Sequence, residues 1–247
     1  TGKPVEIGGS LGRLDSTGRG CMIVAGMELA RRGKRLDGAI VAIQGMGNVG
    51  YNTARLLKEQ GCRIVAVTDS SGGCYSDPRT DSELDMESLR QSKAQGIPLA
   101  ECPGVERISN DELLAMPCDI LVLAAMESQI TAQNASNVRA GTIIEGANGP
   151  VTPAADLILE DMGVQVVPDI LANAGGVVTS YFEWIQGLQH YFWEHHEVEQ
   201  RLEKVMSKAF QQVVELAHEK RTTMRKAALL MGISRVVQAI ELRGIYP

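Results

Sequence analysis

The 247-residue chain is 44% hydrophobic and 22% charged, an ordinary composition for a globular protein with a sizeable core. Its formal net charge is −6 and no basic tract interrupts it, which argues against nucleic acid or an anionic membrane as the main partner. No apolar run reaches the roughly 18 residues of a membrane helix, and no signal-peptide pattern opens the chain. We therefore expect a cytoplasmic protein that holds any phosphate by local geometry.

The first 15 residues are expected to form a glycine-rich loop, followed by a helix from about Ser16 or Thr17 to Arg32. Beyond that helix, strand and helix signals alternate. The apolar or β-branched runs that we expect to form strands are 39–44, 63–68, 105–108, 120–123, 142–145 and 165–167. The expected helices between them are 48–60, 85–95, 111–115 and 153–162. This alternation predicts an α/β fold with a doubly wound, Rossmann-like, mostly parallel sheet and helices on both of its faces.

After Val177 the pattern is helical only, so a C-terminal helical extension is expected. Apolar residues at 198, 202, 205, 206, 209, 213, 216 and 217 form an amphipathic helix stripe. Two short helices, 224–231 and 234–242, are expected on either side of Gly232. We predict one domain over 1–247, with an entry loop and helix (1–35), a Rossmann core (36–176) and the extension (177–247).

The cysteines and histidines do not indicate a metal site. The five cysteines show neither a CxxC pair nor a zinc-ligand spacing, so reduced thiols are expected. His190, His195 and His196 lie near Glu194 and Glu197, but neighbouring histidines on a helix point in different directions. We interpret this segment as a solvated helical face.

Three glycines in "GMGNVG" at 45–50 directly follow the first expected strand. A tight turn alone would give a similar pattern, but the strand–turn–helix–strand context favours a dinucleotide-binding domain. Gly45 permits the turn, Gly47 lets a diphosphate approach the backbone, and Gly50 lets helix and strand pack closely. The helix that begins near Asn48 and Val49 offers N–H groups and a partial positive charge to the phosphates.

Asp69 ends the second expected strand, 19 positions after the last glycine. A carboxylate at this position accepts hydrogen bonds from the adenine ribose and repels a 2′-phosphate. The next residues, beginning with Ser70, supply no positive charge, and the nearest downstream base in the sequence is Arg79. The residues therefore favour NAD over NADP.

Four segments in this order resemble the glutamate dehydrogenase family: "TGKPVEIGGSLGR" at 1–13, "STGRG" at 16–20, "EGANGP" at 145–150 and "VPDILANAGGVVTSYFEW" at 167–184. The resemblance covers the whole chain. It implies interconversion of glutamate with 2-oxoglutarate and ammonium by hydride transfer to NAD or NADP, in a homo-oligomer. NADP users in the family also carry Asp-Ser at the position of Asp69, so this carboxylate does not decide the cofactor.

The resemblance also implies roles for residues near the nicotinamide. Thr17 would hydrogen-bond the carboxamide with Arg13 nearby, and Asn148 and Asn173 would face the nicotinamide and its ribose. Without the resemblance, Asn148 reads as a left-handed turn residue and Asn173 as a helix N-cap.

Two further segments are implied to lie beside the nicotinamide and the substrate. Ser180 would bind the side-chain carboxylate of the substrate in a pocket lined by Val177; otherwise it reads as a helical serine bonded to the preceding turn. The segment "AAMESQI", which begins at Ala124 and Ala125, would run beside the nicotinamide ribose. Leu123 replaces the proline expected there, and Ser128 replaces a common asparagine.

The lysine and aspartate that manage protons in this family lie in an N-terminal substrate domain, and neither of their segments occurs here. Asp169 reads as a structural turn residue. We therefore predict no catalytic residue in this chain, which would bind dinucleotide without turnover and meet glutamate or 2-oxoglutarate together with the missing substrate domain. The alternatives are a non-catalytic dinucleotide-binding regulatory module and a domain of another amino-acid dehydrogenase.

Six of the ten aromatic residues fall within 181–193. They either form ordinary core or cover a surface that meets the missing domain or another subunit. The second reading predicts an apolar patch that stays open in this chain.

Overall fold

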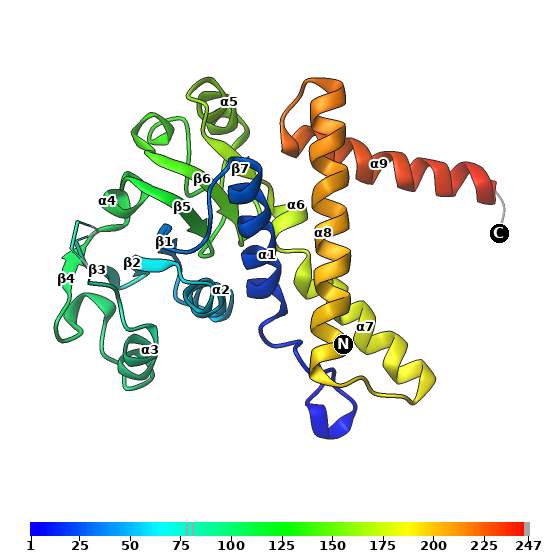
Figure 1. Cartoon of the computed structure of the whole chain (residues 1–247), viewed down its shortest axis with the longest axis horizontal. Coiled ribbons are helices and arrows are strands. Elements are labelled where there is room, and N and C mark those ends of the chain that lie inside the picture. Colours follow the sequence, from blue (N-terminus) through cyan, green and yellow to red (C-terminus); the bar gives the residue numbers. More distant parts are fainter. Residues whose placement is uncertain (78, 81, 245–247) are drawn as a thin grey trace.

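The computed structural model describes residues 1–77, 79–80 and 82–244. Within these residues, one seven-stranded sheet lies beside a group of long helices (Figure 1). The strands are β1 (Ile40–Gln44), β2 (Arg63–Asp69), β3 (Gly72–Tyr75), β4 (Glu106–Ile108), β5 (Cys118–Leu123), β6 (Ala140–Glu145) and β7 (Gln165–Val167). The strand order across the sheet is β4-β3-β2-β1-β5-β6-β7.

Five of these strands, from β2 to β7 across the sheet, pair in parallel, whereas β3 and β4 form an antiparallel edge. The chain leaves β1 toward β2 on one side and later returns to β5 on the other. The strand order therefore reverses at β1, which is where doubly wound sheets hold ligands, at the carboxyl ends of the strands. The predicted fold class is confirmed.

The helices that accompany the sheet are α1 (Ser16–Arg31), α2 (Asn48–Glu59), α3 (Met86–Ala94), α4 (Asn110–Leu114), α5 (Pro153–Asp161) and α6 (Asp169–Ala172). Local sequence explains their starts. The Asp85 side chain accepts from two first-turn N–H groups of α3, Ser109 and Glu112 form a capping box on α4, and Thr152 caps α5 ahead of a proline. The predicted boundaries of the core helices agree within about two residues.

Alternate strand residues point into two hydrophobic cores, one on each face of the sheet. Val41 and Ile43 of β1 lie in the core that includes Val24 of α1, and Ala42 lies in the core that includes Leu159 of α5. Both faces are therefore covered by helices, as a parallel sheet requires.

The prediction missed β3, because Gly72 and Gly73 in its first half are typical of a loop rather than a strand. The structure shows why glycine stands there: a side chain at Gly73 would overlap Thr68 of the neighbouring β2. Close approach accounts for Gly73, whereas Gly72 has φ 112°, a conformation that side chains rarely adopt.

The helical extension consists of α7 (Gly175–Gln189), α8 (His195–Lys220) and α9 (Met224–Arg243). α1 packs between the sheet side and this extension, in contact with both α7 and α8. The predicted break at Gly232 is wrong: α9 is one continuous helix that projects away from the body (Figure 1). A single glycine lowers helix stability by only about 1 kcal/mol relative to alanine, so the good helix formers on both sides of Gly232 keep α9 continuous.

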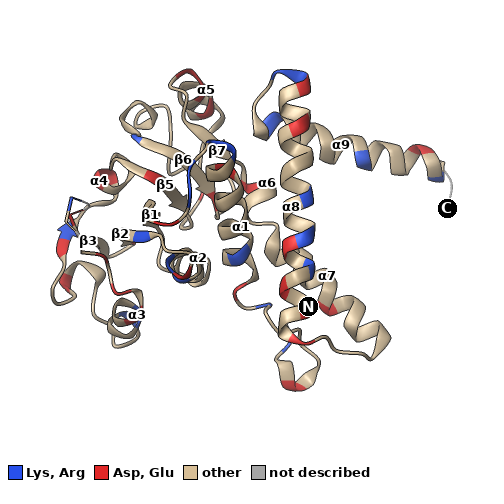
Figure 2. Ribbon diagram, viewed as in Figure 1, with Lys and Arg blue, Asp and Glu red and all other residues tan. Residues whose placement is uncertain are grey.

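Surface charge is mixed. Lys and Arg alternate with Asp and Glu over most elements, and no described element carries a continuous basic stripe (Figure 2). None of the described helices is both long and apolar enough to span a membrane.

Candidate functional site

The glycine turn joins β1 to α2 at the carboxyl edge of the sheet. Gly45 has φ 101°, in the left-handed region, and a Cβ there would lie 2.5 Å from the carbonyl oxygen of Ala124. A Cβ on Gly50 would overlap the carbonyl oxygen of Gly45. By contrast, among the described residues, nothing lies within 4 Å of a Cβ built on Gly47. Two glycines are therefore needed by the fold itself, and the third leaves an open face at the start of α2.

Asn48 begins α2 and fastens the entry loop to this turn. Its Nδ2 donates to the carbonyl oxygen of Leu14 at 2.8 Å, and Asn52 one turn later donates to both Asn48 oxygens. The glycine turn and the entry loop, which were predicted separately, are thus held side by side.

Asp69 ends β2 as predicted, and a lysine contacts it. Lys93 Nζ of α3 donates to Asp69 Oδ2, and the N–H and Oγ of Ser71 donate to Oδ1 at 2.8 and 2.6 Å. Burial raises the pKa of Asp69, but the hydrogen bonds from Lys93 and Ser71 outweigh it, so the pKa lies below its usual value. Ser70 is exposed in the β2–β3 turn.

The cation that contacts Asp69 is therefore not Arg79, the nearest downstream base in the sequence. Arg79 is held by Asp77 at 2.6 Å, whereas the contacting cation, Lys93, lies 24 residues after Asp69. Only the docking of α3 against the end of β2 brings this pair together, so no local pattern could reveal it.

A cavity of about 630 Å³ opens beside the glycine turn, and the turn and this cavity together are called the crevice below. The cavity is lined by nine of the predicted residues, which come from five separate segments of the chain: Arg13, Thr17, Val49, Ala124, Ala125, Asn148, Asn173, Val177 and Ser180. Val49 belongs to the first turn of α2, so this cavity continues directly from the glycine turn.

Arg13 and Ser180 meet inside this cavity. Arg13 Nε donates to Ser180 Oγ at 2.9 Å, so this serine is engaged by the entry loop rather than by the preceding turn of its own helix. Thr17 faces the start of α7, where a Cβ on Gly176 would lie 2.5 Å from Thr17 Oγ1. The Ser180 hydroxyl accepts from Arg13 and keeps its own proton for another acceptor.

Asn148 and Asn173 also meet: Asn173 Nδ2 donates to Asn148 Oδ1 at 2.7 Å. Asn173 is the C-cap of α6 and not the N-cap of α7, which is Ala174. Asp169, predicted as a turn residue, begins α6 and accepts from the Gly149 N–H at 2.8 Å. The turn after β6 is thus supported from α6 on two sides.

The segment after β5 lies against the same turn. Ser128 N–H donates to the carbonyl oxygen of Gly149 at 2.8 Å, and Ser128 has φ 55°. Asparagine tolerates this left-handed conformation better than serine does, which explains why the resemblance leads one to expect asparagine here. Leu123 is buried as the last residue of β5.

Arg225 of α9 binds Glu145, the residue that ends β6 just before the turn that carries Asn148. The sequence analysis did not identify Arg225. Its two Nη atoms donate to the carboxylate of buried Glu145 at 2.8 and 2.7 Å, and its Nε donates to Asp156 at 2.9 Å. The Asp169 N–H also donates to Glu145 at 2.8 Å. Burial raises the pKa of Glu145, and the Arg225 fork opposes that rise. Arg225 lies 80 residues from Glu145, and nothing in the local sequence marks it.

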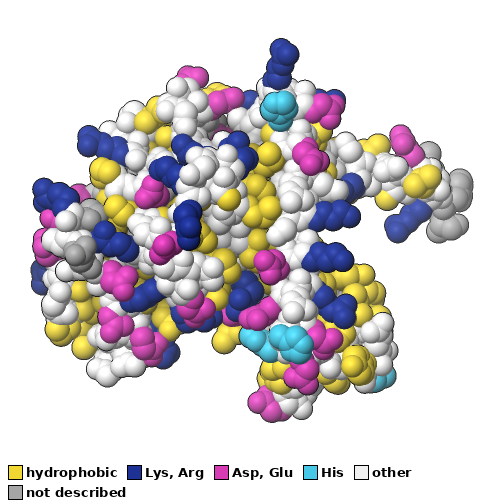
Figure 3. Space-filling view, viewed as in Figure 1, with side chains coloured by type: hydrophobic (Ala, Val, Ile, Leu, Met, Phe, Trp, Pro, Cys, Tyr) yellow, Lys and Arg dark blue, Asp and Glu magenta, His cyan; other side chains and the backbone are white. Residues whose placement is uncertain are grey.

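Four of the six aromatic side chains within 181–193 are more than half exposed: Tyr181, Trp184, Tyr191 and Phe192. The other two, Phe182 and Trp193, are buried with ring centroids 5.3 Å apart. Figure 3 shows apolar side chains gathered over the α7 region at the lower right of the view. The prediction of an open apolar patch in this chain is confirmed.

The histidines and cysteines form no evident metal centre. Within 1–77, 79–80 and 82–244, no group of three or more His, Cys, Asp or Glu side chains is placed to hold a metal ion. His195 instead lies 3.5 Å from Glu199 on the same helix, and all five cysteines are free thiols.

The sheet order and the glycine turn at its switch point define a Rossmann-type α/β domain. The chain belongs to the Glutamate/Leucine/Phenylalanine/Valine dehydrogenase family, whose model matches residues 8–244. The resemblance to glutamate dehydrogenases is therefore confirmed at the level of the family, which is a family of oxidoreductases.

Several glutamate dehydrogenases are similar to the chain over almost its whole length. It is 48% identical to the enzyme of Thermotoga maritima and 41% identical to a cryptic catabolic NAD-specific enzyme of Bacillus subtilis, covering 100% and 99% of this chain but 59% and 56% of those proteins. Among solved structures, a hetero-hexameric glutamate dehydrogenase of Thermus thermophilus matches with a TM-score of 0.91 and 36% identity over 100% of this chain and 57% of its own. The chain thus spans somewhat more than half the length of these relatives.

Proposed function

We propose that this chain is the cofactor-binding domain of a glutamate dehydrogenase, a single unit over 1–247 that presents NAD or NADP to glutamate held by a separate substrate domain. The observation that carries the proposal is the crevice: nine residues chosen from the sequence, distant along the chain, line one cavity that continues from the glycine turn. The full protein would work as a homo-oligomer in the cytoplasm.

The crevice fits a dinucleotide by its shape and donors. The open face at Gly47 and the first N–H groups of α2 would hold the diphosphate, and Asp69 would accept from the adenine ribose. Thr17, Asn148 and Asn173 would orient the nicotinamide. When bound, the nicotinamide supplies the hydride acceptor for the α-carbon of glutamate.

Arg13 and Ser180 favour glutamate over an apolar amino acid. The guanidinium and the hydroxyl face the same cavity, and both can donate to a side-chain carboxylate. An apolar side chain would leave these groups without a partner and would bind poorly. The second candidate is a dehydrogenase for leucine, phenylalanine or valine, the other amino acids in the family name, and these two polar groups argue against it.

Titration calorimetry with NADH, NADPH and ADP-ribose tests the proposal directly. We expect saturable one-to-one binding of NADH, weaker binding of NADPH, and no glutamate-dependent reduction of NAD by this chain. Absence of dinucleotide binding would refute the proposal. Measurable glutamate oxidation would refute the prediction that the catalytic groups lie outside this chain.

Replacing Ser180 by alanine separates the two substrate classes in the full-length protein. If glutamate is the substrate, S180A raises the KM for glutamate without changing the KM for NAD. Unchanged selectivity for glutamate would favour the second candidate.

A further inference from the structure

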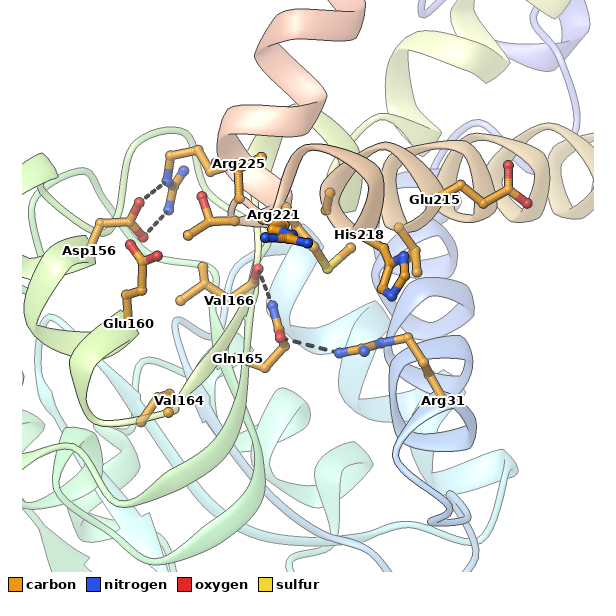
Figure 4. A pocket seen from close by; sticks show the side chains of 16 residues that line it. Arg31, Asp156, Glu160, Val164, Gln165, Val166, Glu215, His218, Arg221 and Arg225 are labelled. Carbon is orange, nitrogen blue, oxygen red and sulfur yellow. Dashed lines mark hydrogen bonds and ion pairs between the residues drawn. The ribbon is translucent and has the colours of Figure 1, made fainter.

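A second cavity, of about 1030 Å³, lies on a different part of the surface and shares no lining residue with the crevice. It is bounded by the edge strand β7, by α5, by the last residue of α1 and by the corner between α8 and α9 (Figure 4). Its walls therefore come from both the Rossmann core and the helical extension. Neither the crevice nor the family resemblance gives it a role.

Most charges in this cavity are already paired. Arg225 is taken up by Glu145 and Asp156, and Arg31 donates to buried Glu28 at 2.9 and 2.7 Å. Glu160 lies 3.7 Å from Lys226 Nζ. These pairs leave little net charge, so the character of the cavity depends on the groups that remain.

Two cationic or donor side chains remain without a partner. Among the described residues, no hydrogen bond or ion pair engages the side chain of Arg221 or of His218. Figure 4 shows the Arg221 guanidinium lying across the cavity between Val166 and His218, with His218 facing Arg31. Glu215, the remaining carboxylate, points away from this group. Arg221 and His218 are both exposed, and within the described part of the chain they offer unpaired donors at the corner between α8 and α9.

Arg221 is the C-cap of α8, and its N–H donates to the carbonyl oxygens of Ala217 and His218. Arg221 follows the last residue of α8 with φ 51° and ψ 53°, a left-handed position that glycine normally fills. The Arg221 side chain is exposed, and His190 adopts the same left-handed conformation at the end of α7.

The rest of the lining is largely apolar and comes from Val164, Val166, Val214, Ala217 and Met224. The volume is that of a site for a small organic molecule, much larger than an inorganic ion needs. We propose that this cavity binds a small organic anion, a carboxylate or phosphate on a partly apolar body, through Arg221 and His218. The proposal is independent of the proposed function of the crevice.

Arg221→Gly is the central test, because glycine removes the guanidinium and also relaxes the left-handed backbone. Without ligand, this variant should melt at the wild-type temperature or slightly above it. His190→Gly is the matched control: His190 has φ 52° at the end of α7 and does not line the cavity. His218→Ala provides a second variant that leaves the backbone turn unchanged.

The probes are 4-methyl-2-oxopentanoate, which carries a carboxylate on an apolar body, and inorganic phosphate, each titrated by calorimetry in saturating ADP-ribose. We expect at least one probe to bind wild type and H190G equally, at least tenfold more weakly to R221G, and at least threefold more weakly to H218A. Preference for the oxo acid identifies a carboxylate ligand, and preference for phosphate identifies an organic phosphate. Equal affinity in R221G, competition with ADP-ribose, or no binding of either probe to wild type at millimolar concentration would overturn the proposal.

Discussion

At the scale of single residues, the Asp69–Lys93 pair bears most directly on cofactor choice. Asp69 alone would repel a 2′-phosphate, but Lys93 places a cation on the same carboxylate. Lys93→Met should therefore weaken NADPH binding at least fivefold and leave NADH binding within about twofold. Calorimetry with both cofactors measures the difference, and Lys58→Met, which removes a cation paired with Glu83 instead of Asp69, is the control. Equal losses for both cofactors would contradict this role.

Glu183 should make stability depend on pH. Burial raises its pKa, but donation from Lys3 Nζ and from the Gly2 and Lys3 N–H groups lowers it from 4.5 to about 2. Because the folded-state pKa is depressed, this contribution is fully present above about pH 4.5 and is lost as the pH falls toward 2. Glu183→Gln should lower stability at pH 7 and flatten that part of the profile. Unfolding by urea between pH 2.5 and 7 measures it; parallel profiles for wild type and variant would exclude Glu183 as the cause.

At the scale of elements, the β1–α2 turn separates glycines required by the fold from one required by a ligand. Gly50→Ala should lower the free energy of unfolding by about 2 kcal/mol or more, because the new Cβ overlaps the Gly45 carbonyl oxygen. Gly47→Ala meets no described atom and has φ −86°, so its stability should change by less than about 0.5 kcal/mol. Yet G47A should bind NADH at least tenfold more weakly. Unimpaired binding by G47A would leave the motif as a tight turn only.

α9 is expected to position the turn that carries Asn148, through Arg225. Arg225→Gln leaves the buried Glu145 carboxylate without its fork and should lower stability by about 3 kcal/mol. It should also weaken NADH binding several-fold while sparing ADP-ribose, which lacks the nicotinamide. General destabilisation would affect both ligands equally. Arg235→Gln, on the same helix and bonded only to Gln212 among the described residues, is the control.

How far the sequence predicted these elements depends on how local their causes are. The glycine turn, the short helix predicted over 111–115 and the strands around β1 were predictable because each cause lies within a few residues. β3 was missed because Gly73 is required by the close approach of Thr68 and Gly72 by its positive φ, and neither cause is visible in the local sequence. α9 was predicted as two helices because the prediction gave Gly232 too much weight as a helix breaker.

In the crevice, Val49 was predicted from the glycine motif and the other eight predicted lining residues from the resemblance. No local pattern indicates Lys93 or Arg225, because tertiary docking brings them to their partners.

At the scale of the whole molecule, apolar side chains are exposed along both α7 and α9. The aromatic side chains over α7 are exposed, and α9 carries Ile233, Val236 and Ile240 at more than half exposure on a projecting helix. Patches of this kind mark contact surfaces in soluble proteins. The chain spans 59% of its Thermotoga relative, so the unmatched part of such a protein is the partner that we propose for the α7 patch.

The α7 patch should therefore bind hydrophobic dye and promote self-association of this chain. Replacing Tyr181, Trp184 and Tyr191 together by glutamine should at least halve the fluorescence of bound anilinonaphthalene sulfonate and shift sedimentation toward the monomer. The melting temperature should stay within a few degrees, because these exposed rings contribute little to the core. Leu157→Gln, a similarly exposed change on α5, should have no effect on either measurement. Dye binding and sedimentation that do not respond to the triple variant would show that this surface is not a contact site and would place the domain contact elsewhere.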